Sequence, residues 1–264
     1  MRNHQSLLAF LLGSVLIGIV TLQGCAPVGV YRERAQMAAV AQNRDYDIPD
    51  LNSYGEWIAI NPYGRVWRPY VAAGWQPFSY GHWIYSDVGW VWVSYEPFGW
   101  VVYHYGSWYY SEDDGWVWVP GYGGWSPAIV DWIQYGDYVC WAPLAARGVV
   151  WDRPWEEHNH NVWTVIRAEN FTRDNVGQQR ITGADLHMGD QPVGVMQRAP
   201  GPQEIESRTH QPVATMNVSR DPVSVGSSQI HRMQVPESET QRVEKYRGTV
   251  ERDVLRRPDQ GEHR

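Results

Sequence analysis

Leucine and methionine are missing from the middle of this chain of 264 residues. Neither occurs from Asn52 to Pro143, and isoleucines are few there. Any hydrophobic core in this stretch must therefore be built from other side chains. All 16 tryptophans lie between Trp57 and Trp163, and a buried aromatic side chain removes about 150–250 Å² from water. We therefore interpret most of these tryptophans as core residues and not as an exposed ligand platform.

Basic residues are also scarce in this stretch. From Tyr54 to Leu144 the only arginines are Arg65 and Arg68, and no lysine occurs. Eight acidic residues oppose them, so the net charge of the stretch is minus six. The acidic residues are Glu56, Asp87, Glu96, Glu112, Asp113, Asp114, Asp131 and Asp137. Binding of single-stranded nucleic acid needs a basic groove along the phosphates, so nucleic acid is excluded as a partner, and docking on anionic lipid by charge is disfavoured.

Cysteine is nearly absent, with Cys25 and Cys140 as the two thiols. Cys140 lies between Val139 and Trp141, which predicts a small buried apolar residue and not a nucleophile. If Cys25 is acylated, one thiol remains, and one thiol forms no intramolecular disulfide even in an oxidising compartment.

The first residues have the pattern of an export signal. Arg2 and His4 precede an uncharged apolar run from Leu7 to Val20, which is too short to span a bilayer comfortably. The next residues, Leu22-Gln23-Gly24-Cys25, resemble the bacterial lipobox, in which the cysteine takes a diacylglyceryl group and becomes the new N-terminus. An ordinary secretory signal is the alternative.

This resemblance implies an address and an anchor. We expect residues 1–24 to be a lipoprotein signal peptide, and residues 25–50 to be a lipidated N-terminus and a linker. The link to the membrane is then the lipid anchor alone. Ala26 stands where an aspartate marks inner-membrane retention in many bacteria, so the resemblance implies the outer membrane.

A repeat of roughly 25 residues organises the aromatic stretch. Tyr54-Gly55-Glu56-Trp57, Tyr80-Gly81-His82-Trp83 and Tyr105-Gly106-Ser107-Trp108 start successive units, and Tyr135-Gly136-Asp137-Tyr138 resembles a truncated fourth start. Turn residues with glycine recur at nearly every eighth position, between short runs rich in Trp, Tyr and Val. We therefore predict an all-β domain over residues 51–176. It is an antiparallel meander of about ten short strands from three and a half repeats, either open or curled into a barrel or a sandwich.

Aligning the repeats distinguishes two tryptophan positions. Trp67, Trp92 and Trp118 coincide, which indicates a position that requires an indole. Two residues earlier, Arg65, Trp90 and Trp116 coincide. Because an unpaired buried guanidinium is costly, we hypothesise that this second position is near solvent and that Trp90 and Trp116 form an exposed strip. The strip either binds a ligand or a partner or packs on a neighbouring element.

The composition changes after the aromatic domain. Residues 177–264 contain no tryptophan and are rich in Gln, Arg, Glu, Asp, Pro and Ser. We expect a disordered polar tail, because such a segment buries too little apolar surface to offset its ordering entropy. One helix is possible, since Val243, Tyr246, Val250 and Val254 have helical spacing.

Motifs for chemistry are weak. His158 and His160 are candidate metal ligands on a strand, but no partner motif accompanies them, and a solvated polar loop is the favoured interpretation. Adjacent acids such as Asp113 and Asp114 are typical of a turn and not of a glycosidase pair. No nucleophile elbow, phosphate loop or paired-cysteine motif occurs. We predict that the protein is not an enzyme, and we expect no metal and no other cofactor.

The set of motifs resembles a known but uncharacterised family. Tyr-Gly-x-Trp followed by Gly-Trp-Val-Trp-Val, and closed by Tyr138-Val139-Cys140-Trp141-Ala142-Pro143-Leu144, is similar to a domain of unknown function in Trp- and Tyr-rich bacterial envelope proteins, some of which carry FecR-type domains. The resemblance covers Tyr54 to Val176, with departures at Arg65, Arg68 and Cys140. It implies a lipoprotein domain and adds no catalytic residue.

These observations lead to two expectations about function. The first is a non-catalytic outer-membrane lipoprotein with a structural or protein-interaction role in the cell envelope. The alternative is a module that binds glycan or peptidoglycan through exposed tryptophans.

Overall fold

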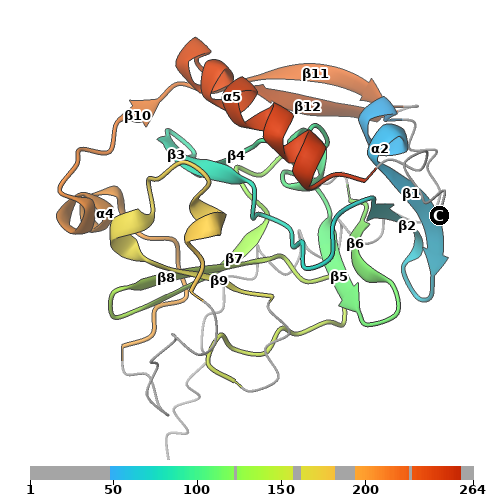
Figure 1. Cartoon of the computed structure of the whole chain (residues 1–264), viewed down its shortest axis with the longest axis horizontal. Coiled ribbons are helices and arrows are strands. Elements are labelled where there is room, and N and C mark those ends of the chain that lie inside the picture. The colour runs from blue at the N-terminus through green and yellow to red at the C-terminus, as the bar shows by residue number, and fades with distance from the viewer. Residues whose placement is uncertain (1–47, 122–123, 157–161, 182–193, 226–227, 257–264) are drawn as a thin grey trace, which may run out of the picture.

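The computed structural model describes residues 48–121, 124–156, 162–181, 194–225 and 228–256. The predicted signal peptide, Cys25 and nearly all of the predicted linker lie outside these ranges. Twelve strands and a few helices make up the described part of the chain (Figure 1). The prediction of a mainly antiparallel β fold is confirmed.

Each Trp-rich segment folds into one antiparallel hairpin. The hairpins are β1 (Gly55–Ile60) with β2 (Gly64–Pro69), β3 (Gly81–Ser86) with β4 (Gly89–Ser94), β5 (Ser107–Ser111) with β6 (Gly115–Val119), and β7 (Val130–Tyr135) with β8 (Tyr138–Pro143). In every hairpin a tryptophan of the first strand lies opposite one of the second. These pairs are Trp57 with Trp67, Trp83 with Trp92, Trp108 with Trp118 and Trp132 with Trp141.

Turn glycines explain why the hairpins reverse where they do. Gly64, Gly89 and Gly115 all have positive φ angles, a backbone conformation that side chains with a Cβ rarely adopt. The predicted fourth repeat start, Tyr135 to Tyr138, is instead the turn between β7 and β8, where Gly136 also has a positive φ. That prediction is wrong because a Tyr-Gly pair serves equally well at a strand start and in a turn.

The hairpins do not follow one another as a simple meander. The strand orders are β1-β2-β6-β5, β10-β3-β4, β7-β8-β9 and β11-β12, where β9 is Thr164–Arg167, β10 is Thr215–Met216, β11 is Ser219–Val225 and β12 is Ser228–Gln234. The first and third hairpins join through Trp67 opposite Trp118, while the second lies in another sheet. Short helices α2 (Pro49–Tyr54) and α3 (Gly99–Val102) flank and interrupt the array, where we expected none. The intervening segments redirect each hairpin so that its indoles meet the others.

The indoles form the core, as the scarcity of leucine and methionine predicted. Trp67, Trp92, Trp108, Trp118 and Trp141 are completely buried, and they contact one another and the neighbouring Phe and Tyr rings mainly edge to face or tilted. The position that holds Trp67, Trp92 and Trp118 is buried in all three hairpins. The prediction that it requires an indole is consistent with this burial.

The glycine of each Tyr-Gly-x-Trp motif has a packing reason. A Cβ added to Gly55 would lie 2.4 Å from the indole of Trp67, one on Gly81 would lie 2.6 Å from the indole of Trp92, and one on Gly106 would lie 2.6 Å from the indole of Trp118. Each indole therefore lies against bare backbone of the preceding strand. The Tyr-Gly-x-Trp motif is visible in the sequence, but the close approach of the indole to the glycine backbone is not.

We therefore expect Gly81→Ala to destabilise the protein by about 1–3 kcal/mol, the usual cost of overpacking a core. Its methyl group would lie 2.5 Å from the backbone oxygen of Val93, which cannot move as a side chain does. Gly248→Ala is the matched control, because Gly248 is inside a helix with open space around it, and alanine there should raise stability by roughly 1 kcal/mol. Urea titrations monitored by circular dichroism measure both changes. Equal effects of the two substitutions would contradict the packing argument.

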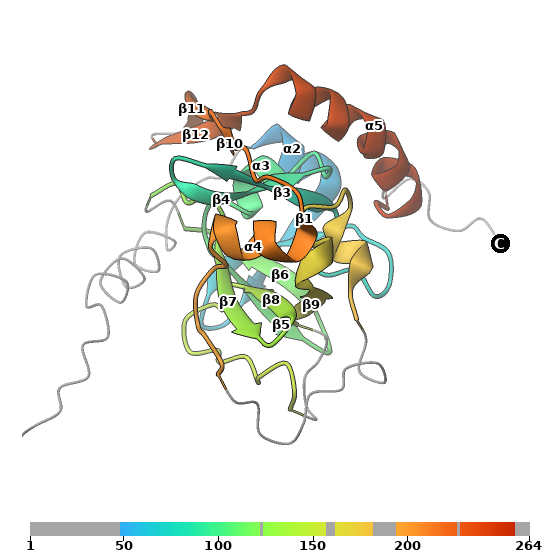
Figure 2. The same cartoon turned by 90° about the vertical axis from the view of Figure 1, so that its left-hand side faces the viewer.

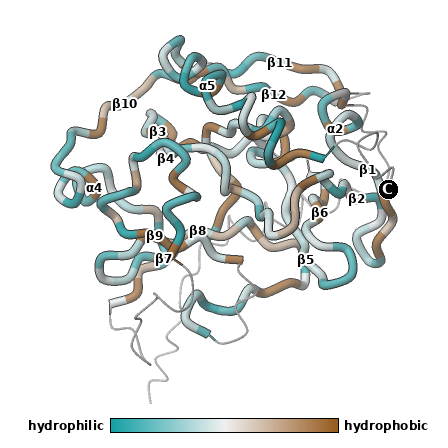
Figure 3. Tube along the Cα trace, viewed as in Figure 1, coloured by the Kyte–Doolittle hydropathy of each residue, from teal (hydrophilic) through white to brown (hydrophobic). Residues whose placement is uncertain are grey.

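The structure corrects the expectation of a disordered C-terminal tail. Within residues 194–256 the chain forms α4 (Pro202–Thr209), β10, β11, β12 and α5 (Glu237–Asp253). Figure 2 shows α5 lying across one end of the molecule and α4 beside the short 3-10 helices η1 (Ala168–Asn170) and η2 (Val176–Gln179). The predicted helical spacing is confirmed in α5, since Val243 and Val250 are buried. Hydrophilic residues cover much of the rest of this helix (Figure 3).

Side chains of the aromatic domain hold this C-terminal segment in place. Tyr246 stacks on Tyr95 at 4.8 Å, and the guanidinium of Arg232 lies 4.1 Å from the ring centre of Trp100. The carboxylate of Glu239 is hydrogen-bonded to Nε2 of the buried His82, with 2.6 Å between Oε2 and Nε2. Composition alone underestimated the order because the apolar surface that the segment needs is supplied by the aromatic domain.

Candidate functional site

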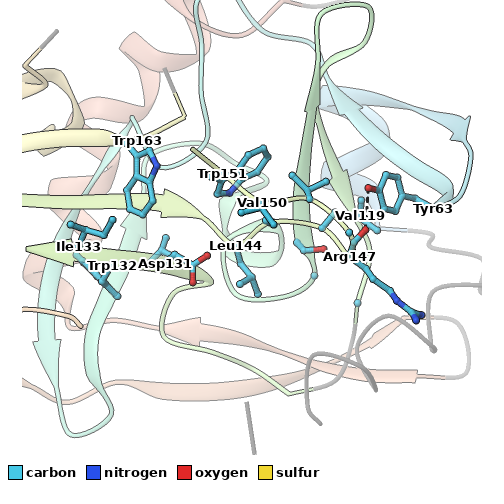
Figure 4. A pocket seen from close by; sticks show the side chains of 18 of the residues that line it. Tyr63, Val119, Asp131, Trp132, Ile133, Leu144, Arg147, Val150, Trp151 and Trp163 are labelled. Carbon is cyan, nitrogen blue, oxygen red and sulfur yellow. Dashed lines mark hydrogen bonds between the residues drawn. The ribbon is translucent and has the colours of Figure 1, made fainter. Parts of the chain in front are cut away.

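A groove of about 1140 Å³ lies between the hairpin β5–β6 and the strand β7 (Figure 4). Residues 144–151, which follow β8, run along it, and Gln197 and Arg198 from the C-terminal segment contribute to its rim. We call it the β5–β7 groove. Its residues come from parts of the sequence more than 100 residues apart, so no local motif marks it.

Aromatic side chains line much of the groove. Trp132 and Trp151 are half-buried, Trp163 is buried, and Tyr63 lies at the end near Arg147. Hydrogen bonds orient two of these indoles. Trp151 Nε1 donates to the Pro143 carbonyl at 2.7 Å, and Trp163 Nε1 donates to the Asp152 carbonyl at 2.7 Å. The aromatic walls are therefore held in place without a ligand.

The charge of the groove is opposite to that of the whole chain. Asp131 is the one acid among its lining residues, whereas Arg147, Arg153 and Arg198 are basic. Arg198 pairs with Glu204, and Arg153 can donate to the side-chain oxygen of Gln197 at 2.6 and 2.7 Å. Arg147 is exposed and forms no ion pair with another residue of the described part of the chain. Three arginines and one acid therefore line the groove, with Glu204 paired to Arg198 and the Glu156 carboxylate accepting from the Arg153 backbone at 2.6 Å, so Arg147 is the arginine without a neighbouring acid among the described residues.

Each sheet edge beside the groove is bridged to another segment at one residue. At the β5 edge, Trp108 N donates to the Leu144 carbonyl at 2.8 Å, and Ala146 N donates to the Trp108 carbonyl at 2.7 Å. At the β7 edge, Gln134 and Met196 exchange two backbone hydrogen bonds of 2.8 and 3.0 Å. These contacts leave side chains to make the inner surface of the groove.

A buried carboxylate lies elsewhere in the core. Glu96 is 2% exposed and accepts hydrogen bonds from Trp75 Nε1 at 2.7 Å, from the Tyr103 hydroxyl and from Ser94 Oγ at 3.2 Å. Burial raises the pKa of Glu96 to about 7, although these three donors act in the opposite direction. In the sequence Glu96 is only one of eight acids in the aromatic stretch, because the donors that surround it come from separate segments of the fold.

Two histidines and the cysteine are also internal. Burial lowers the pKa of His104 to about 4, against hydrogen bonds to the backbone of Ser126 and Pro127. Burial also lowers the pKa of His82, whose ring nitrogens face Tyr95 and Glu239. Cys140 is fully buried, and burial raises the pKa of its thiol to about 12. The predicted small buried cysteine is confirmed, and a thiol in this state is a poor nucleophile.

The exposed strip predicted at Arg65, Trp90 and Trp116 is not present. Trp90 is 6% exposed and Trp116 is 7% exposed, so the hypothesis is wrong for both indoles. The C-terminal segment covers the first, whose Nε1 donates to the Pro200 carbonyl at 2.8 Å. Trp151 covers the second, with ring centres 5.7 Å apart. Only Arg65 is exposed, and its guanidinium lies over the Trp57 ring.

The remaining candidate residues form no site within the described part of the chain. His158 and His160 lie outside the described residues, as does Cys25. Asp114 forms a turn with Ser111, whose Oγ accepts from the Asp114 backbone. Within the described ranges, no three His, Cys, Asp or Glu side chains converge as metal ligands do. Of the helices described, none combines the length and apolar character needed to cross a membrane.

The fold and the groove define a Trp-rich β-domain with a C-terminal segment packed on it. Residues 48–148 match the model of a family of unknown function (DUF6600). This match covers the four hairpins and ends at the loop that enters the groove, so the rest of the groove lies beyond it. No curated protein and no solved structure matches the chain.

Proposed function

We propose that this protein is a non-catalytic lipoprotein of the outer membrane that binds a partner in the cell envelope through the β5–β7 groove. The observation that carries the proposal is a preformed groove with aromatic walls and a basic rim on an acidic protein. Concave sites with fixed apolar walls and a few polar groups are typical of binding sites.

The ionisable side chains with strongly shifted pKa values support binding over catalysis. Such groups often mark active sites, but Glu96, His104 and Cys140 are inside the core and do not line the groove. Their hydrogen bonds and contacts join strands of the fold. The groove itself contains arginine and tryptophan side chains, which are enriched among the residues that dominate binding energy at interfaces.

A cross-linking experiment in a Gram-negative host tests this function. We expect a benzophenone amino acid at Val150, which is 89% exposed on the groove, to capture an envelope component. The same group at Val88, 43% exposed in the turn between β3 and β4 and outside the groove, is the control. Cys25→Ser should move the protein from the membrane to the soluble fraction and reduce capture. Equal capture from both positions, or capture from neither, would contradict the proposed function.

A further inference from the structure

We propose that the ligand of the β5–β7 groove is a carboxylate-bearing glycan strand, namely peptidoglycan with its peptide stems. This inference rests on the proposed function and names the chemical class of its partner. Three properties of the groove favour this class: its size, its bridged sheet edges and the arrangement of its arginines and aromatic rings.

The size of the groove favours a polymer. Its volume of about 1140 Å³ is close to the upper limit of the range of roughly 300–1,000 Å³ that is usual for a small-molecule site. Its lining runs from Pro62 and Tyr63 near the β1–β2 turn to Trp163 and Arg198 beside the third sheet. A ligand that contacts both ends must be extended.

The bridged sheet edges disfavour a peptide bound as an added strand. That mode of recognition needs free backbone donors and acceptors at a sheet edge. Next to the groove, the β5 edge is bonded to Leu144 and Ala146, and the β7 edge is bonded to Met196. These bridges interrupt the pairing that a long added strand would need, which favours recognition by side chains, and this suits a chain of sugar rings.

The side chains of the groove match an acidic glycan. The indole of Trp151 is half-buried and offers apolar surface to the face of a sugar ring, while the half-buried Trp132 packs on Trp83 with ring centres 4.7 Å apart. Asp131, also half-buried, places a carboxylate in the lining. Arginine binds carboxylates through paired hydrogen bonds, and the lining includes Arg153 and the exposed Arg147, which lies beside Tyr63 (Figure 4) and would meet the carboxylates of the peptide stems.

The envelope location selects among acidic glycans. A protein held by the predicted lipid at Cys25 is confined to the membrane surface, and the acidic glycan that faces the outer membrane from within the periplasm is peptidoglycan. A secreted polyuronate would present similar carboxylates without peptide stems. The experiment includes this second source as a separate arm.

Calorimetric titration of the mature full chain with Cys25→Ser tests the inference. The probes are solubilised peptidoglycan strands with intact stems, neutral chitin oligosaccharides, polyuronate oligosaccharides and the free stem peptide. We expect binding of the peptidoglycan strands, with at least tenfold weaker binding of the other three. Arg147→Glu should weaken the peptidoglycan complex at least tenfold, because the exposed Arg147 has no structural ion pair to lose among the described residues. The matched control is Arg173→Glu, an exposed arginine outside the groove, which should change affinity less than twofold.

Several results would overturn the inference. Equal affinity for chitin would show that carboxylates are not required for binding. Equal affinity for polyuronate would show that the ligand is not specifically peptidoglycan. Equal affinity for the free stem peptide would show that the glycan is not recognised. Unchanged binding by Arg147→Glu would show that the ligand does not bind in the groove. Should no glycan bind while Val150 still captures an envelope protein, the ligand class fails and the proposed function stands. Absence of both signals rejects the two together.

Discussion

Trp118→Ala is expected to reduce the free energy of unfolding by about 3–5 kcal/mol, the usual cost of truncating a large buried aromatic side chain. The indole of Trp118 is completely buried, and its Nε1 donates to the Tyr105 carbonyl at 2.8 Å. It lies opposite Trp108 in its own hairpin and opposite Trp67 of the first hairpin. Its loss therefore leaves a cavity where two hairpins join and removes the hydrogen bond to the Tyr105 carbonyl.

This loss is large compared with the total stability of a domain, which is about 5–15 kcal/mol. Guanidinium titrations monitored by far-UV circular dichroism measure it. The matched control is Trp155→Ala, since Trp155 is half-buried and contacts Tyr135 at the margin of the core. We expect that variant to lose less than about 2 kcal/mol. If both variants lose the same stability, the ranking of the tryptophans by burial does not describe the core.

The local structure was largely predictable from the sequence. The turn glycines, the hairpins around them and the buried position of Trp67, Trp92 and Trp118 all follow from residue patterns within about 25 residues. Local patterns contain the backbone requirements of a turn and the alternation of a strand. They therefore identify a hairpin without reference to the rest of the chain.

The pairing of the hairpins was not predictable in this way. Trp67 pairs with Trp118 across a segment that contains the whole second hairpin, and nothing local distinguishes this arrangement from a meander. The exposure of Trp90 was misjudged for the same reason, because its cover is Pro200. The repeat alignment assumed that equivalent positions have equivalent neighbours, whereas each copy is covered by a different segment.

The groove also depends on contacts between residues that are far apart in the sequence, so it was not predictable from local patterns. Arg147, Arg153 and Arg198 belong to two separate loops, and their common location depends on the bridge between Gln134 and Met196. The sequence stretch with minus six net charge ends at Leu144, just before the first of these arginines. Charge counted along the sequence therefore indicated an acidic surface, while the fold brings the basic residues together.

Glu96→Gln is expected to change how stability depends on pH. Burial raises the pKa of Glu96 to about 7 in the folded protein, compared with about 4.3 in an unfolded chain. As the pH rises between these values, the unfolded chain releases the proton first, so the wild-type protein loses stability relative to the variant. One pKa unit corresponds to about 1.4 kcal/mol, so the difference between the two proteins should change by about 3 kcal/mol in favour of Glu96→Gln.

The comparison between variants is essential because His104 acts in the opposite direction. Its lowered pKa of about 4 means that stability is lost as the pH falls below the unfolded value. This contribution is common to both proteins and cancels in their difference, although it flattens the wild-type curve. Urea titrations at a series of pH values from about 4 to about 8 measure the difference directly.

A second substitution separates the charge of Glu96 from its hydrogen bonds. Glu96→Leu removes the acceptor for Trp75 Nε1 and the Tyr103 hydroxyl, and each unpaired buried donor costs roughly 1–3 kcal/mol at every pH. We therefore expect Glu96→Leu to be less stable than Glu96→Gln throughout the range, with a parallel pH profile. A constant difference between wild type and Glu96→Gln would show that the pKa of Glu96 is the same in the folded and unfolded protein. In that case the three donors offset burial, and the carboxylate is a buried charge at neutral pH that joins three segments of the core.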